Sequence, residues 1–154
     1  MKNKIDSLIR AIVIIACSTL FSCATTQQTQ LKSRDAEGYN NRGFTYCEIG
    51  QYDQAISDFS KAIEINPRLA PAYNNRGWAY IKKGQYDQAF WDFNKTIEID
   101  PRFAEAYFNR AVVNFFKEEY DKSLVDVIKA QQLGYQIPLK FLDDLRKAAG
   151  GIGV

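Results

Sequence analysis

Residues 36–69 read AEGYNNRGFTYCEIGQYDQAISDFSKAIEINPRL, and residues 70–103 read APAYNNRGWAYIKKGQYDQAFWDFNKTIEIDPRF. Placed one under the other without a gap, the two stretches share YNNRG, GQYDQA, DF, IEI and PR in register, 34 residues apart. A third, looser copy follows at 104–137, AEAYFNRAVVNFFKEEYDKSLVDVIKAQQLGYQI. A fixed period of this length is the signature of stacked helix–turn–helix units, so the sequence predicts an all-α fold.

These copies resemble the tetratricopeptide repeat. That family places aromatic residues at repeat positions 4 and 11, a small residue at 8, and Ala, Phe, Ala and Pro at 20, 24, 27 and 32. The first two copies match almost throughout, with Pro67 and Pro101 at position 32, whereas the third has Asn114 at position 11 and Tyr135 at position 32. The resemblance implies a short right-handed α-solenoid of three helix pairs over 36–137, which is an interaction scaffold.

The residue pattern also predicts where the helices begin and end. Gly50 and Gly84 are expected to stop the first helix of their repeats, and Glu118 stands at that place in the third copy. The second helices are expected over 53–65, 87–99 and 121–132, each with an aspartate as its N-cap: Asp53, Asp87 and Asp121. Residues 138–149 form an amphipathic capping helix, with a frayed tail to 154.

The capping helix is expected to carry Leu139, Leu142 and Leu145 on one side, against the open end of the stack.

An arginine and an aspartate recur at fixed positions in all three copies. Position 7 is Arg42, Arg76 and Arg110, and position 23 is Asp58, Asp92 and Asp126. We predict an ion pair across each helix pair, semi-exposed and contributing about 0.2–1 kcal/mol. Arginines that bind an acidic ligand are the alternative.

The N-terminus reads as an export signal. Residues 1–22 combine a basic start with an apolar run at 11–22, which is shorter than the roughly 20 residues that a membrane span needs. Leu20-Phe21-Ser22-Cys23 resembles the lipobox of bacterial lipoproteins, which implies a lipidated Cys23 and, with Ala24 next, anchoring in the outer membrane facing the periplasm. Residues 23–35 would form a flexible tether. Ile14-Ile15-Ala16-Cys17 also fits the lipobox pattern but would leave a very short apolar core, so Cys23 is preferred. A plain signal peptide, or an uncleaved anchor, is the alternative.

Composition excludes several classes of function. The chain has no histidine, which removes the commonest general base and metal ligand, and no other residues form a catalytic or metal constellation. Three basic residues and one acidic residue lie in 1–22, so residues 23–154 carry 17 basic and 17 acidic side chains out of 20 and 18. A neutral domain argues against nucleic acid as a partner. We therefore expect no enzyme activity and no cofactor.

The first helices would line a concave groove, because repeat positions 2, 5, 6, 9, 12 and 13 face it in this family. Position 6 is an asparagine in every copy, and aromatic residues flank it; the candidate groove residues are Asn40, Asn41, Asn74, Asn75, Asn109, Phe44, Trp78 and Phe108. An asparagine both donates and accepts, so a row of them suits the main chain of an extended peptide. The row is similar to the asparagine ladder of the O-linked N-acetylglucosaminyltransferases. Amides that simply face water are the alternative.

The dicarboxylate clamp of chaperone adaptors is a rival site, but of its five positions only Asn75 fits. Cys47 would be the free thiol left after processing, and a buried or groove-lining role is preferred to a reactive one. The sequence therefore predicts a membrane-tethered adaptor that binds a segment of another envelope protein. Self-association into an envelope assembly, driven by the dense aromatic residues, is the alternative.

Overall fold

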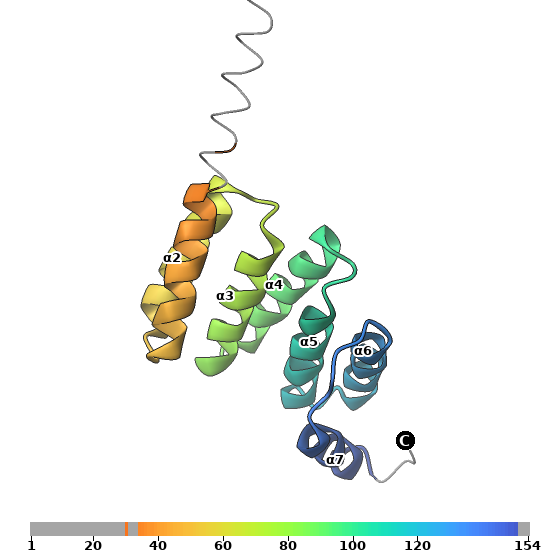
Figure 1. Ribbon diagram of the computed structural model, residues 1–154. Coiled ribbons are helices and arrows are strands. Elements are labelled where there is room, and N and C mark those ends of the chain that lie inside the picture. The colour runs from red at the N-terminus through yellow and green to blue at the C-terminus, as the bar shows by residue number, and fades with distance from the viewer. Residues whose placement is uncertain (1–29, 31–33, 151–154) are drawn as a thin grey trace, which may run out of the picture.

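The computed structural model describes residue 30 and residues 34–150, and in this part of the chain every regular element is a helix. The first helix spans 34–48, and the others follow in order: α2 (Tyr52–Ile65), α3 (Ala70–Lys82), α4 (Tyr86–Ile99), α5 (Ala104–Phe116), α6 (Tyr120–Gln132) and α7 (Leu139–Ala148). Successive helix pairs stack along the molecule, and α7 closes the C-terminal end (Figure 1). The predicted solenoid of three helix pairs and a cap is confirmed. The expected signal peptide, Cys23, most of the tether and residues 151–154 lie outside the described residues.

Each helix pair closes around one large side chain that faces a small one. Phe59 and Phe93 are fully buried, and a Cβ atom built on Gly43 or Gly77 would lie 2.7 Å from the facing ring. Glycine at position 8 is therefore what lets the phenylalanine at position 24 fill the seam. In the third pair, Ala111 replaces the glycine and Val127, which is smaller than phenylalanine, replaces the ring. Both are buried in one cluster.

The turn inside each repeat depends on a left-handed residue. Gly50 and Gly84 have φ angles of 75° and 73°, which is the conformation that glycine adopts without strain. Glu118 takes the same place in the third repeat with φ at 61°, so the turn is retained even though glycine is not. The predicted helix stops at Gly50 and Gly84 are confirmed, and the third repeat turns at the equivalent position.

The prediction for the N-caps was wrong. Helices α2, α4 and α6 begin at a tyrosine after Gln51, Gln85 and Glu119, and none of these N-caps makes a side-chain hydrogen bond to the helix. The aspartates are the second residue of each helix and lie in its first turn, where a negative charge still favours the helix N-terminus. Asp53 instead pairs with Lys83, and Asp87 accepts a hydrogen bond from Lys117 Nζ at 2.7 Å. These aspartates thus link neighbouring repeats.

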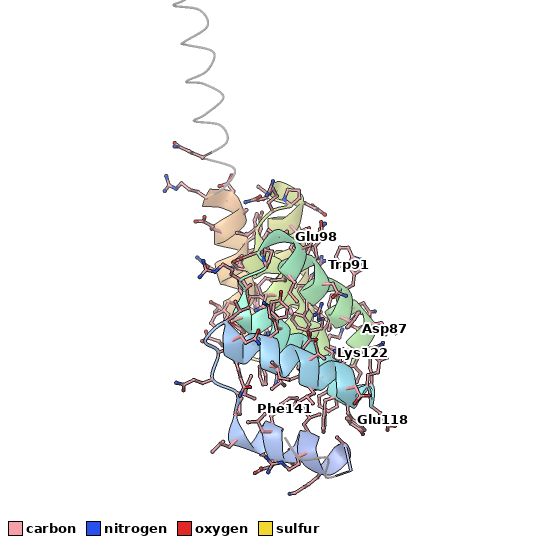
Figure 2. The ribbon with its side chains drawn as sticks, turned by 90° about the vertical axis from the view of Figure 1, so that its right-hand side faces the viewer. Asp87, Trp91, Glu98, Glu118, Lys122 and Phe141 are labelled. Carbon is pink, nitrogen blue, oxygen red and sulfur yellow. The ribbon has the colours of Figure 1, made fainter. Side chains whose placement is uncertain are left out.

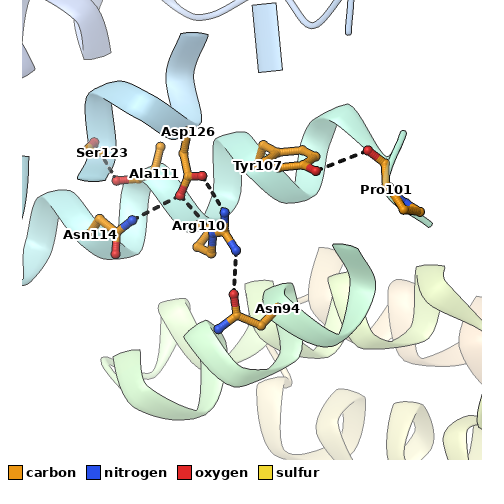
Figure 3. Close-up of polar contacts among 8 residues, drawn as sticks. All are labelled: Asn94, Pro101, Tyr107, Arg110, Ala111, Asn114, Ser123 and Asp126. Carbon is orange, nitrogen blue, oxygen red and sulfur yellow. Dashed lines mark hydrogen bonds and ion pairs between the residues drawn. The ribbon is translucent and has the colours of Figure 1, made fainter. Parts of the chain in front are cut away.

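Tyrosine at position 4 also connects one repeat to the next. Tyr73 donates its hydroxyl to the carbonyl of Pro67 at 3.3 Å, and Tyr107 donates to the carbonyl of Pro101 at 3.2 Å, as Figure 3 shows for the second pair. Both tyrosine rings are buried. The tyrosine therefore satisfies a carbonyl in the loop that precedes its own helix.

The capping helix packs on the stack through Leu142 and Leu145, two of the three predicted leucines. Leu145 is buried as expected, but Leu139 is 79% exposed, so the prediction for Leu139 was wrong. Phe141 supplies the missing contact, because its ring lies 5.3 Å from the centroid of Phe108 and 5.5 Å from that of Phe115. Figure 2 shows Phe141 pointing from α7 toward the stack. Aromatic side chains on α5 thus decide the orientation of the cap.

Candidate functional site

The predicted arginine–aspartate pairs form in all three repeats. Arg76 and Arg110 each grip their aspartate with two parallel hydrogen bonds of 2.6–2.9 Å, and Arg42 makes the same fork with Asp58. The Arg76–Asp92 pair is less exposed than expected, since only 15% of the Arg76 side chain and 1% of the Asp92 side chain is accessible. The predicted ion pair across each helix pair is therefore confirmed.

The second and third arginines also connect repeats. Arg76 Nη1 donates to Ser60 Oγ of the preceding repeat at 3.0 Å. Arg110 Nη1 likewise donates to Asn94 Oδ1 of the preceding repeat at 2.5 Å, as Figure 3 shows. Arg42 lies in the first repeat, before which the described residues contain no further repeat, and 55% of its side chain is exposed. Each guanidinium thus bridges two repeats wherever a preceding one exists.

The pKa values of Asp58 and Asp92 are shifted in opposite directions. The guanidinium of Arg42 lowers the pKa of Asp58 below its usual value of 3.8, because its hydrogen bonds favour the carboxylate. Burial raises the pKa of Asp92, although the hydrogen bonds from Arg76 oppose that rise. Identical partners thus give opposite shifts, and the difference lies in how deeply each carboxylate is enclosed.

The asparagines form inter-repeat hydrogen bonds with one another. Asn75 Nδ2 donates to Asn40 Oδ1 at 3.1 Å, and Asn109 Nδ2 donates to Asn74 Oδ1 at 3.0 Å. Position 6 of one repeat therefore holds position 5 of the repeat before it. Asn74 Nδ2 continues the network to Glu105 Oε1 at 3.3 Å. The amides that were predicted to meet a peptide are partly used to set the spacing of the repeats.

A pocket of about 230 Å³ opens beside this network. Its lining comes from all three repeats: Phe44, Cys47 and Glu48 of the first helix, Phe59 of α2, Asn75 and Trp78 of α3, and Glu105 of α5. Phe59 and Cys47 are buried, whereas Phe44 is 52% exposed. The pocket is therefore a mostly apolar depression that crosses the first helices of successive repeats.

The predicted groove residues do not all meet in this pocket. Phe44, Asn75 and Trp78 line it together. Asn109 and Asn74 are buried, Asn40 is half-buried beneath its bond from Asn75, and Asn41 is exposed beyond the pocket lining. Phe108 stacks against Tyr135, with ring centroids 5.0 Å apart, and belongs to the contact with the cap.

Two acidic residues of the pocket were not among the predicted site residues. Glu48 and Glu105 occupy repeat positions 13 and 2, which both face the groove in this family, so the repeat register contained the signal that would have found them.

Cys47 forms part of the pocket wall. Its thiol is free and buried, and burial raises its pKa to about 11, so the thiol stays protonated at neutral pH. A protonated thiol is a poor nucleophile and behaves as a small apolar side chain. This agrees with the groove-lining role that we preferred.

Other site chemistries find no support in the part of the chain that the structure describes. Within residues 34–150, no group of three or more histidine, cysteine or acidic side chains is placed to hold a metal ion. No helix in the same range has the length and apolar character to cross a membrane.

Comparison with known proteins agrees with this geometry. The sequence profile of the tetratricopeptide repeat matches residues 36–69 and 70–103. The chain therefore contains tetratricopeptide repeats, and the third helix pair, α5 and α6, continues the same stack. No curated protein sequence matches the chain.

Solved structures share the fold. The TPR2B domain of yeast Sti1, in a complex with pHsp70, has a TM-score of 0.68 and 27% identity over 75% of this chain and 96% of that one. The OM64 domain of Arabidopsis has a TM-score of 0.71 and 24% identity over 75% and 98%. MamA has a TM-score of 0.62 and 30% identity over 66% and 59%. The fold is thus a protein-interaction scaffold and generally not an enzymatic one.

Proposed function

We propose that this protein is a membrane-tethered, non-enzymatic adaptor that binds an extended peptide segment of a cell-envelope protein. The observation that carries the proposal is the pocket in which Phe44, Asn75 and Trp78 meet on the first helices of successive repeats. Apolar walls with a few polar groups are the usual composition of a binding site. The similarity to a repeat domain solved in complex with pHsp70 supports a protein or peptide as the ligand class.

The groove is tested by capture with a matched pair of tryptophan variants. Trp78 lines the pocket, whereas Trp91 is 57% exposed on the outer side of α4, as Figure 2 shows. The full chain in detergent, wild type or variant, is immobilised and incubated with solubilised membranes, and captured proteins are identified by mass spectrometry. We expect a protein that wild type and Trp91→Ala retain and Trp78→Ala loses. Equal capture by all three would exclude the pocket as the binding site.

Some asparagine variants are harder to interpret than the tryptophan variants, because they also remove hydrogen bonds between repeats. Asn109 is buried and bonded to Asn74, so its removal would disturb the repeat spacing as well as the groove. Asn75→Ala is the informative change, because Asn75 is half-buried in the pocket wall. We expect weaker capture with unchanged helical circular dichroism.

The membrane tether rests on the lipobox resemblance around Cys23, and it has its own test. Growth of a producing diderm bacterium with labelled palmitate should mark wild type and Cys17→Ser, but not Cys23→Ser. Label in Cys23→Ser, or in none of the three, would remove the lipid anchor from the proposal.

Self-association is the second candidate, and one observation favours it. A mostly apolar groove of about 310 Å³ lies between α6 and α7, and its lining includes exposed Ile128. Apolar surface of this kind can bury itself against a second copy. If the protein acts as an adaptor and does not self-associate, light scattering over a hundredfold range of concentration should show a constant monomer mass. A mass that rises with concentration and falls in Ile128→Ser would favour assembly.

A further inference from the structure

The charged residues that line the pocket are of one sign. Its lining includes two carboxylates, Glu48 from the first repeat and Glu105 from the third, and it includes no lysine or arginine. Both glutamates are exposed, and Glu105 lies in the first turn of α5. A ligand that crosses the three repeats at this point would therefore pass two negative charges.

Neither charge is balanced by the protein. Among residues 34–150 the ion pairs join other partners, and Glu48 and Glu105 take part in none of them. The contact of Glu105 is with a neutral amide, Asn74 Nδ2 at 3.3 Å. Lys82 lies near the pocket, but its Nζ is over the Trp78 ring, 4.7 Å from the centroid. The two carboxylates of the pocket thus differ from the position-23 aspartates, each of which has its own arginine.

The interior of the pocket has the opposite character. Phe59 forms a fully buried part of the wall, Cys47 adds a protonated thiol, and Phe44 and Trp78 add ring surface. At about 230 Å³ the pocket is smaller than the 300–1,000 Å³ that hold drug-sized ligands, so it fits one large side chain of a peptide. Asn75 is the remaining polar group, suited to the peptide main chain.

These features point to a peptide of particular chemistry. Accepting the groove as the binding site, we infer that its ligand is a peptide segment with a large apolar residue flanked by lysine or arginine. The apolar residue enters the pocket between Phe44 and Trp78, and the flanking cations pair with Glu48 and Glu105. An acidic peptide is disfavoured, because its carboxylates would face two like charges with no cation in the lining to offset them.

The inference is tested with three fluorescent nine-residue peptides and the full chain in detergent, by anisotropy at low salt. The first has a central leucine between lysines, the second has the same leucine between glutamates, and the third has alanine in place of leucine between lysines. We expect the lysine–leucine peptide to bind about tenfold more tightly than the glutamate–leucine peptide. This preference should shrink in 0.5 M salt, because exposed charges are screened.

Charge-neutralising variants connect the preference to the pocket. Glu48→Gln and Glu105→Gln should each weaken the lysine–leucine peptide by roughly 1.5- to 5-fold, the range of an exposed ion pair. Glu98→Gln removes the same charge from the outer helix α4 (Figure 2) and should leave the affinity unchanged. The glutamate–leucine peptide should gain affinity in the double variant Glu48→Gln/Glu105→Gln.

The outcomes separate this inference from the proposed function. If the leucine peptides bind better than the alanine peptide, but lysine and glutamate flanks bind equally, the groove is a peptide site and the charge inference is overturned. The same holds if Glu98→Gln weakens binding as much as the pocket variants do. If none of the peptides binds wild type, both the inference and the peptide-binding function are overturned.

Discussion

At the scale of the residue, the helix pairs depend on complementary sizes at two repeat positions. Gly77 allows Phe93 to fill its seam, and a Cβ at Gly77 would meet the ring at 2.7 Å. We expect Gly77→Ala to lower the free energy of unfolding by about 1–3 kcal/mol, because the ring has to move in a packed core. In a Phe93→Val background the same change should be better tolerated, since Val127 already accepts Ala111 in the third repeat. A double-mutant cycle in urea measures the coupling, and equal penalties in both backgrounds would contradict it.

The opposite shifts of Asp58 and Asp92 lead to a prediction on pH. The pKa of Asp58 is lowered in the folded protein, so its charge stabilises the fold above pH 3.8, and this contribution is lost as the pH falls through the folded pKa. The stability of wild type relative to Asp58→Asn should therefore decrease on acidification below that pH. Asp92 has a raised pKa, so wild type should gain stability relative to Asp92→Asn as the pH falls. Urea unfolding of the three proteins at pH 6, 4 and 3 decides whether the trends are opposite.

At the scale of the element, the capping helix packs on the stack through Leu142, Leu145 and the ring of Phe141. Phe141 packs on Phe108 and Phe115 of α5, whereas Leu139, two positions earlier, is exposed. We expect Phe141→Ala to destabilise the protein by about 2 kcal/mol, since a half-buried ring with two aromatic partners is lost. Leu139→Ala is the matched control and should stay within about 0.5 kcal/mol of wild type. Similar losses for both variants in thermal unfolding would contradict the observed face of α7.

The sequence predicted most of these elements, and the failures have physical causes. The second helices begin within one residue of the predicted positions, because the repeat period and the turn residues constrain them strongly. The N-cap role of Asp53 was wrong because a lysine of the next repeat offers it a partner across the stack, 30 residues away. Leu139 was misplaced for a similar reason, since Phe141 makes the contact with the aromatic residues of α5 in its place.

The candidate site was harder to predict than the fold. The repeat register alone predicted that Phe44, Asn75 and Trp78 face the same groove, and all three line one pocket. It did not reveal that the amides of Asn74 and Asn109 bond to each other, because a side chain that faces a groove can reach either a ligand or the next repeat. Only the packed stack shows which of these contacts is made.

At the scale of the whole molecule, the two ends of the solenoid differ in how they are covered. In the described part of the chain, α7 packs over the last helix pair, whereas the first helix, 34–48, contacts neighbours on one side of the stack only. Its arginine shows the difference, because Arg42 is 55% exposed and Arg110 is 21% exposed. In a repeat protein, stability is a sum of repeat and interface contributions, so an end with fewer interfaces opens more easily.

We therefore expect amide hydrogen exchange to be graded along the chain. Amides of α4 and α5 should exchange most slowly, since these helices have repeats or the cap on both sides, and amides of the helix at 34–48 should exchange fastest among the helices of the repeats. In Phe141→Ala the amides of α5 and α6 should lose more protection than those of 34–48, because the covered end then resembles the uncovered one. Uniform protection along wild type, or an equal loss everywhere in Phe141→Ala, would instead mean that the stack opens as a single unit.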